Sequence, residues 1–204
     1  PLTFCGDYPK GFLKGTKMNT IKYNASTLAA VALAISTEET RYYLNGVMLN
    51  GITAVATDGH LMTVAVDDSE RAKDNPTDAP AIMPISKKAI TAMKGKKAEY
   101  VEFKDGTLTV WDEFDNKLYM EPSEAIDGTF PDWERVMPST DDSQVSHGAF
   151  GADLLITVAN GAKILGNGSG ALAVQLRGED ATSPHYVKYG DLENVYSVLM
   201  PRRV

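Results

Sequence analysis

One pattern, repeated three times, restricts the fold of this chain more than any other feature. Three segments carry apolar residues at helical spacing, and they lie at 26–36, 86–94 and 152–165. Their starts are 60 and 66 residues apart, and three strand-like segments follow each of them. A period of this size is typical of repeated supersecondary units. The sequence therefore predicts three units, each with one strand, one helix and three further strands.

The predicted strands complete an α+β fold with antiparallel sheets and helices on one face. Strands that follow the helices are expected at 41–49, 53–57, 61–66, 100–103, 107–111, 117–120, 171–176, 185–188 and 195–199. Short extended runs that precede the helices are expected at 20–23, 81–84 and 146–150. Turns typical of hairpins separate several strands, at Asn50-Gly51, Asp58-Gly59, Asp105-Gly106 and Tyr189-Gly190-Asp191. Ser26 or Asn24 could cap the first helix, Ser86 opens the second, and Gly95 and Gly166 follow the second and third.

Composition restricts the class of protein. The chain has 43% hydrophobic and 23% charged residues, which is ordinary for a globular protein in water. No segment approaches the roughly 20 apolar residues of a membrane helix. The single cysteine, Cys5, cannot form an internal disulfide, which fits a cytoplasmic location. The net charge of −7 argues against coating DNA by bulk charge, but it allows lysines gathered on one surface.

The first residues differ from the rest of the chain. Residues 1–17 are rich in glycine, proline and lysine and show no periodicity. Strand-like and helix-like patterns begin directly after Met18. We therefore expect residues 1–17 to form a tail outside the fold.

Four segments resemble the bacterial DNA polymerase III beta subunit, the beta sliding clamp family. Residues 41–46 read RYYLNG and residues 55–60 read VATDGH, a strand and turn of that family's middle domain. Residues 130–138 read FPDWERVMP, which resembles the connection between its middle and last domains. Residues 196–204 read YSVLMPRRV, which resembles its last strand and tail. The resemblance covers roughly residues 18–204 and implies a DNA-clamp-like fold.

The resemblance also predicts how the chain is divided. A clamp subunit has three similar domains of two units each, whereas this chain has three units. Residues 18–138 would form a complete clamp-like domain, and residues 139–204 would form a half domain with the C-terminal tail. A ring would then need several copies of the chain, so we expect a homo-oligomer. Two third units could pair across a twofold axis to complete a domain.

The resemblance implies an apolar pocket that binds short peptides of DNA polymerase and other clamp-binding proteins. Such a groove needs apolar walls, a few polar atoms and adaptable methionines. Carried over by position, the pocket residues are Leu44, Thr57, Gly59, His60, Met62, Pro138, Val198, Met200 and Arg202. Leu61 stands where the family usually has arginine. The alternative interpretation is that Leu44, Met62 and Val198 are ordinary core residues.

The resemblance also implies contact with double-stranded DNA without sequence specificity. Five lysines fall on or just after the second helix, at Lys87, Lys88, Lys94, Lys96 and Lys97. In the family such helices line the central hole and hold phosphates, a role that suits a flexible point charge. Tyr42 and Tyr43 could reach DNA from a loop edge. The alternatives are a solvated helix face for the lysines and strand packing for the tyrosines.

No enzyme motif is present in the sequence. It has no P-loop, dinucleotide fingerprint or nucleophile elbow, and we expect no cofactor or metal. The three histidines, His60, His147 and His185, lie too far apart to suggest a metal site. We therefore predict a non-enzymatic processivity factor, served by a possible clamp loader. One alternative is an interaction module that binds clamp-binding peptides without encircling DNA, and another is a small hydrolase using Asp58 and His60.

Overall fold

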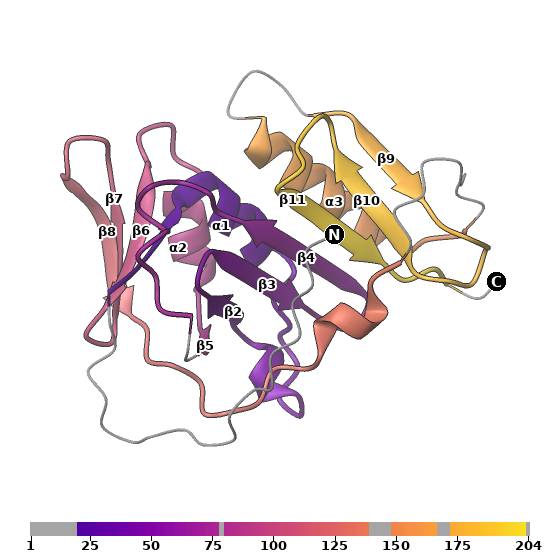
Figure 1. Cartoon of the computed structure of the whole chain (residues 1–204), viewed down its shortest axis with the longest axis horizontal. Helices are drawn as coiled ribbons and strands as arrows, with labels where there is room; N and C mark the ends of the chain where they lie inside the picture. Colours follow the sequence, from indigo (N-terminus) through magenta and orange to yellow (C-terminus); the bar gives the residue numbers. More distant parts are fainter. Residues whose placement is uncertain (1–19, 78–79, 139–147, 167–171, 203–204) are drawn as a thin grey trace.

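The computed structural model describes residues 20–77, 80–138, 148–166 and 172–202, and within these it contains two antiparallel sheets and three α-helices (Figure 1). The smaller sheet has the strand order β1 (Ile21–Asn24), β6 (Tyr100–Lys104), β7 (Thr107–Trp111) and β8 (Lys117–Pro122). The larger sheet is seven-stranded, in the order β5 (Ala81–Met83), β2 (Val47–Asn50), β3 (Thr53–Thr57), β4 (Leu61–Val66), β11 (Val195–Leu199), β10 (His185–Tyr189) and β9 (Val174–Arg177). Residues 139–147 and 167–171 lie between these described parts.

The first two units interlock by exchanging a strand. The strand β1 precedes the first helix but pairs with β6 of the second unit. The strand β5 precedes the second helix but pairs with β2 of the first unit. Each of the first two units therefore contributes one strand to the sheet of the other.

The third unit joins the first through one continuous sheet. Strand β11 pairs antiparallel with β4 over five residues, from Val195 opposite Ala65 to Leu199 opposite Leu61. The seven-stranded sheet therefore crosses the predicted boundary at residue 138. The division into a complete domain and a half domain stays a prediction.

Three helices pack against the inner faces of the sheets and share one apolar core. Helix α1 (Ala25–Ala32) contacts both sheets as well as α2 (Lys87–Met93) and α3 (Ala152–Leu165). Its small residues, such as Ala29 and Ala32, are buried and allow this close approach. The Asn24 side chain accepts from Thr27 N at 3.1 Å, and Ser86 Oγ accepts from Ala89 N at 3.1 Å. Of the two candidate caps of the first helix, Asn24 is the cap and Ser26 lies inside the helix, and Ser86 caps the second helix as predicted.

The hairpin turns confirm the predicted turn chemistry. Gly51, Gly59, Gly106 and Gly190 all have a positive φ, which glycine adopts without steric cost. Asp105 precedes Gly106 with a φ of 49°, so both central residues of this turn are left-handed. Two left-handed residues match the twist of a two-residue hairpin.

Four predicted segments differ from the structure by more than two residues at one end. The strand expected at 171–176 starts only at Val174, because residues 172–173 have no regular structure. The expected strand at 41–49 begins as a 3-10 helix, Tyr42–Leu44, because Leu44 N donates to Arg41 O at 2.8 Å; β2 starts only at Val47. The first helix ends at Ala32, since Ala34 and Ile35 bond three residues back in a tighter turn. Residues 148–150 of the expected strand at 146–150 have no regular structure, and residues 146–147 lie outside the described part.

Candidate functional site

The outer face of the seven-stranded sheet carries a second, smaller apolar cluster. Its buried members come from four neighbouring strands and are Met48, Val55, Met62, Val64 and Val198. Met62 lies directly opposite Thr57 on one side and opposite Val198 on the other. Cross-strand neighbours of this kind touch on one face of a sheet. Three of the predicted pocket residues therefore form a single row across the junction of β3, β4 and β11.

The segment that connects the second and third units covers part of this face. Phe130, Trp133 and Met137 pack against the cluster, with Trp133 in a 3-10 helix, Trp133–Val136. Pro138, a predicted pocket residue, ends the described part of this segment and is half-buried. The resulting wall of aromatic and methionine side chains borders the row of Thr57, Met62 and Val198.

The turn between β3 and β4 holds the polar end of the site. Asp58 Oδ1 accepts from the backbone N of both His60 and Leu61 at 2.8 Å. Thr57 Oγ1 donates to Leu61 O at 2.9 Å and accepts from Gly59 N at 3.0 Å. Asp58 therefore stabilises the turn, because its carboxylate accepts hydrogen bonds from the backbone. His60 and Gly59 remain exposed at the tip.

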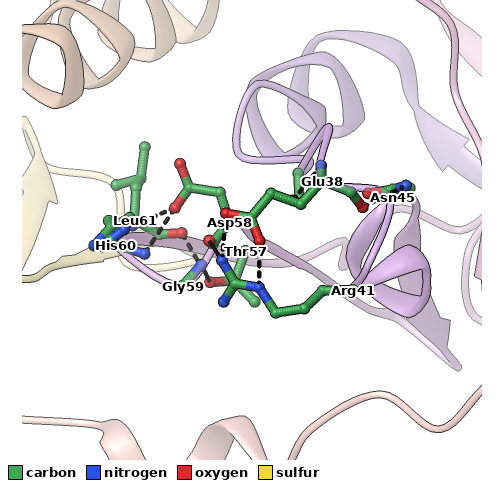
Figure 2. Close-up of polar contacts among 9 residues, drawn as sticks. Glu38, Arg41, Asn45, Thr57, Asp58, Gly59, His60 and Leu61 are labelled. Atoms are coloured by element: carbon green, nitrogen blue, oxygen red, sulfur yellow. Dashed lines mark hydrogen bonds and ion pairs between the residues drawn. The ribbon is translucent and has the colours of Figure 1, made fainter.

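Arg41 fixes this turn against the neighbouring loop (Figure 2). Its guanidinium binds the Glu38 carboxylate through two bonds of 2.8 and 2.7 Å and also donates to Asp58 O at 3.1 Å. The ion pair lowers the pKa of Glu38 and raises that of Arg41. A Cβ on Gly59 would lie 2.5 Å from Arg41 Nη1. Arg41 and Glu38 thus position the turn, a role that the sequence motifs do not indicate, although Arg41 opens the RYYLNG segment.

Three predicted pocket residues remain, and each has different surroundings. Met200 is 36% exposed, and its backbone N donates to His60 O at 2.9 Å, which brings the C-terminal tail to the β3–β4 turn. Leu44 is buried in the 3-10 helix that follows Arg41. Arg202 is exposed, and its backbone N donates to Ala149 O at 2.7 Å beside the start of α3.

A chain of buried hydroxyls lies on the inner side of the same junction. Ser197 Oγ is 2.7 Å from Thr63 Oγ1 of β4 and 2.8 Å from the hydroxyl of Tyr189 in β10. Burial raises the pKa of Tyr189, so its phenol stays protonated and able to donate. The chain joins β4, β11 and β10 beneath the outer row.

Two stacked tyrosines border the outer row on its β10 side. Tyr186 lies opposite Val198, and its ring centroid is 5.3 Å from that of Tyr196. Burial raises the pKa of Tyr196 to about 12, with smaller contributions from Tyr186 and Glu134. This side of the row is therefore aromatic, with Arg177 opposite Tyr186 at its border.

The five predicted DNA-binding lysines are close together in the sequence, and all five side chains are exposed. Lys87 and Lys88 begin α2, Lys94 caps its C-terminus, and Lys96 and Lys97 occupy the following turn. None of the five forms an ion pair within the part of the chain that the structure describes. Lys97 contributes weakly to lowering the pKa of Asp112, after the dominant hydrogen bonds from Asn116. These lysines form a basic surface on α2.

Tyr42 and Tyr43 lie in the 3-10 helix near Arg41 and not on α2. Tyr42 is 52% exposed, whereas Tyr43 is half-buried, and their rings meet edge to face with centroids 5.9 Å apart. The alternative interpretation, that both tyrosines pack as alternating strand residues, is wrong because Tyr42–Leu44 is a 3-10 helix. Of the two, Tyr42 has the exposure that contact with DNA would require.

Comparison with known proteins identifies the family. Residues 20–132, more than half of the chain, match the family model of the DNA polymerase III beta subunit, central domain. The chain belongs to the DNA polymerase III beta subunit family. It is 35% identical over 116 residues to the beta sliding clamp of Caulobacter vibrioides strain NA1000 / CB15N. That alignment covers 52% of this chain and 30% of the relative, so the chain matches less than a third of its curated relative's length.

Solved structures of this family share the fold over nearly the whole chain. The beta sliding clamp of Caulobacter crescentus has a TM-score of 0.62 at 23% identity, covering 100% of this chain and 70% of that one. The clamp of Pseudomonas aeruginosa has a TM-score of 0.61 at 19% identity, covering 97% and 69%. The predicted α+β, clamp-like fold is confirmed. In the described residues, no helix is long and apolar enough to cross a membrane.

Proposed function

We propose that this chain works as a sliding-clamp-type processivity factor, which touches duplex DNA with α2 and holds replication proteins by short peptides. The observation that carries the proposal is the row of Thr57, Met62 and Val198 beside the bonded pair of His60 and Met200. Residues from the middle domain and from the C-terminal tail meet there on one sheet face. Family membership supports this reading of the site.

The physical character of the row suits an extended peptide with aliphatic or aromatic side chains. Met62 and Val198 are buried apolar residues at the base of the row, and Met200, which is 36% exposed, is an adaptable side chain at its rim. The exposed turn at Gly59 and His60 offers polar atoms that can orient a peptide backbone or a glutamine amide. Glu38 and Arg41 hold that turn rigid, which lowers the entropy cost of binding.

Peptide binding can be tested with a double substitution at the rim. His60→Ala together with Met200→Ala should weaken the binding of a peptide with a glutamine and aliphatic or aromatic residues by about tenfold or more. The matched control is Met120→Ala, which removes a methionine that is 54% exposed on the other sheet. Isothermal titration calorimetry measures both variants. Unchanged affinity in the double variant would rule out this site.

The lysine surface on α2 supports non-specific contact with DNA. Five exposed ammonium groups lie within eleven residues, while the whole chain has a net charge of −7. Positive charge is therefore concentrated where phosphates could be held without reading bases. α2 packs against the helix-bearing side of the sheets, whereas the peptide row lies on the outer face.

DNA contact can be tested by charge reversal. Lys87→Glu with Lys94→Glu should weaken duplex binding and reduce the slope of log K against log salt by about 0.9 for each lost phosphate contact. Lys104→Glu with Lys117→Glu is the control, since both lysines are exposed in the smaller sheet. If the α2 variant binds DNA like the control while still binding peptide, the chain is an interaction module that does not hold DNA.

The same proposal gives the chain no catalytic role. The Asp58 carboxylate accepts two backbone hydrogen bonds and orders a turn, so it is occupied as a structural group. A hydrolase using Asp58 and His60 would lose turnover in His60→Ala with the fold intact. We also propose the division into a domain at 18–138 and a half domain at 139–204, which limited proteolysis would test by cutting near residue 138.

A further inference from the structure

A charged surface cavity lies at the edge of the smaller sheet. It is bordered by β1, β6 and the segment 67–77 that follows β4, and its volume is about 400 Å³. Cavities of this size are at the lower end of the range that small ligands occupy. Its lining shares no residue with the peptide row or with the lysine surface on α2. The cavity is therefore a separate candidate site.

The outer face of β1 and β6 forms one side of the cavity. Lys22 lies directly opposite Glu102 in this antiparallel pair. Their neighbours in the sequence, Ile21 and Phe103, are buried in the core. Because side chains alternate between the two faces of a strand, Lys104 lies on the same outer face as Glu102. The two strands thus present two lysines and one glutamate to the cavity.

The segment 67–77 forms the other side and is tied to the edge of β1. The Asn75 side chain accepts from Lys22 N and donates to Lys22 O, both at 2.8 Å, and it also donates to Gly51 O at 3.0 Å. It therefore binds both backbone polar groups of Lys22, as a neighbouring strand would. Asn75 is buried, so this attachment is shielded from water. Arg71 and Asp74 are held at the cavity by a fixed segment.

Two cationic side chains of the cavity converge on one aromatic ring. Lys22 Nζ lies 5.6 Å and Arg71 Cζ lies 4.8 Å from the centre of the Tyr100 ring. The ring attracts each cation, but the two like charges repel each other. An anion bound by both the ammonium and the guanidinium group would relieve this repulsion.

The cations of the cavity are only partly compensated by acids. Lys22 is 3.6 Å from the Glu102 carboxylate, and Arg71 is 3.5 Å from that of Glu99. These distances exceed the about 2.7–2.9 Å of a charge-assisted hydrogen bond. Lys104 forms no ion pair within the described residues. All three cations can therefore donate further hydrogen bonds to an anion.

Two acids in the lining restrict what that anion can be. Asp74 and Glu102 repel a phosphate, but their carboxylates accept hydrogen bonds from hydroxyl groups, as acidic residues do from ribose in nucleotide sites. A fitting ligand needs negative charge for the three cations and hydroxyl donors for the two acids. A phosphate monoester carries about −1.5 to −2 charges at pH 7 and three acceptor oxygens. A sugar that bears such a phosphate meets both requirements.

We propose that this cavity binds a small sugar phosphate, a phosphate monoester with free hydroxyl groups. Arg71 binds the phosphate with its planar fork of donors, and Lys22 and Lys104 add two flexible cations. Asp74 and Glu102 accept hydrogen bonds from the hydroxyl groups. Because the site uses no residue of the peptide row or of the lysine surface on α2, it can fail while the proposed function stands, and the reverse also holds.

Isothermal titration calorimetry of the full chain with ribose 5-phosphate tests the proposal. Inorganic phosphate and ribose are the matched probes, since each carries only one of the two recognised groups. Ribose 5-phosphate should bind about tenfold more tightly than inorganic phosphate, and ribose should give no signal. Adenosine monophosphate distinguishes the sources of this chemistry. Tighter binding than ribose 5-phosphate would identify a nucleotide as the ligand, and equal or weaker binding would identify a sugar phosphate.

Substitutions assign the two recognised groups to named side chains. Arg71→Ala and Lys104→Ala should each weaken ribose 5-phosphate binding by about tenfold, and Arg71→Lys should be intermediate because it keeps the charge without the fork. Asp74→Ala should weaken ribose 5-phosphate binding by about fivefold. The same variant should bind inorganic phosphate at least as tightly as before, because the lost carboxylate only repels it. An acid that served only to shape the cavity would not give this difference between the two probes.

The control variant is Lys117→Ala, which changes an exposed lysine of the same sheet outside the cavity. Lys117 Nζ is 5.8 Å from the centre of the Trp111 ring, so the control also removes a cation beside an aromatic ring. It should leave ribose 5-phosphate binding unchanged. Circular dichroism confirms that each variant is folded, and the glutamine-containing peptide should bind all of them equally.

Four results would overturn the proposal. They are no binding of ribose 5-phosphate at millimolar concentration, equal affinity for ribose 5-phosphate and inorganic phosphate, and unchanged binding in the Arg71→Ala variant. The fourth is competition by a duplex oligonucleotide without terminal phosphates, because its singly charged phosphodiesters would then be the true occupants.

Discussion

At the scale of single residues, Ser197 is a buried polar link between the first and third units. Its hydroxyl contacts Thr63 of β4 and Tyr189 of β10 while being fully buried. Two of the three residues belong to segments 134 positions apart in the chain. A buried hydroxyl chain has strict geometry, because every unmatched group costs free energy.

Removing this hydroxyl should destabilise the fold more than a typical surface change. Ser197→Ala leaves Thr63 and Tyr189 short of a partner, and we expect a loss of about 1–3 kcal/mol in the free energy of unfolding. Tyr189→Phe removes the neighbouring hydroxyl, and the double variant should lose less than the sum. Urea unfolding of all three variants measures the coupling, and strict additivity would show that the hydroxyls act independently.

Tyr196 predicts how stability changes in alkali. Burial raises its pKa from 10.0 to about 12, so folding favours the protonated phenol. The resulting stabilisation is fully present below pH 10 and is lost as the pH rises toward 12. Tyr196→Phe should therefore flatten the decline in unfolding free energy between about pH 10 and pH 12. The exposed Tyr42→Phe serves as control, and equal slopes in the two variants would contradict this assignment.

Sequence patterns predicted single residues well where the chemistry was local. The caps at Asn24 and Ser86 and the left-handed glycines follow from short-range steric and hydrogen-bonding rules. The Arg41–Glu38 clamp and the Ser197 hydroxyl chain were not predicted. Their partners lie far along the chain or depend on a loop conformation, and side-chain type alone does not specify either.

At the scale of elements, the β3–β4 turn depends on one glycine. Gly59 has a φ of 92°, and an added Cβ would meet the Arg41 guanidinium. Gly59→Ala should cost about 1–3 kcal/mol of unfolding free energy and weaken peptide binding, because the turn and its clamp must both shift. Gly95→Ala is the matched control, since Gly95 does not have a positive φ. Equal stability of the two variants would show that the turn adapts freely.

The 3-10 helix at Trp133–Val136 gives an optical signal for the outer face. The chain has two tryptophans, and Trp133 packs against the cluster that contains Met62 and Val198. In a Trp111→Phe variant, Trp133 is the remaining tryptophan. Binding of a glutamine-containing peptide should change its fluorescence emission, and the dissociation constant from this signal should equal the one from calorimetry. A peptide that binds without altering Trp133 emission would place the binding site elsewhere.

Element boundaries were predictable where hydrophobic periodicity was regular. Strands β3, β4, β7 and β11 and helix α3 have the predicted bounds. The prediction for 41–49 was wrong at its start, because aromatic residues that favour strands are held in a 3-10 turn. Leu44 N donates to Arg41 O, and Ser36 N donates to Leu44 O. The exchange of β1 and β5 between the first two units could not be predicted from local sequence, because it depends on how the two units pack against each other.

At the scale of the whole molecule, the chain separates two kinds of surface. Lysines gather on α2, on the helix-bearing side, and an apolar row lies across the outer face of the seven-stranded sheet. The four motif segments pointed to this arrangement through the family resemblance. Their meeting at one sheet face could not be derived from the sequence alone, because it requires the β4–β11 pairing.

The most direct test of this account is a ternary binding measurement. The anisotropy of a labelled glutamine-containing peptide is followed as it binds the chain, with and without saturating duplex DNA. The account predicts the same peptide affinity in both cases, loss of DNA binding alone in Lys87→Glu with Lys94→Glu, and loss of peptide binding alone in His60→Ala with Met200→Ala. Displacement of the peptide by DNA, or loss of both activities in one folded variant, would contradict it.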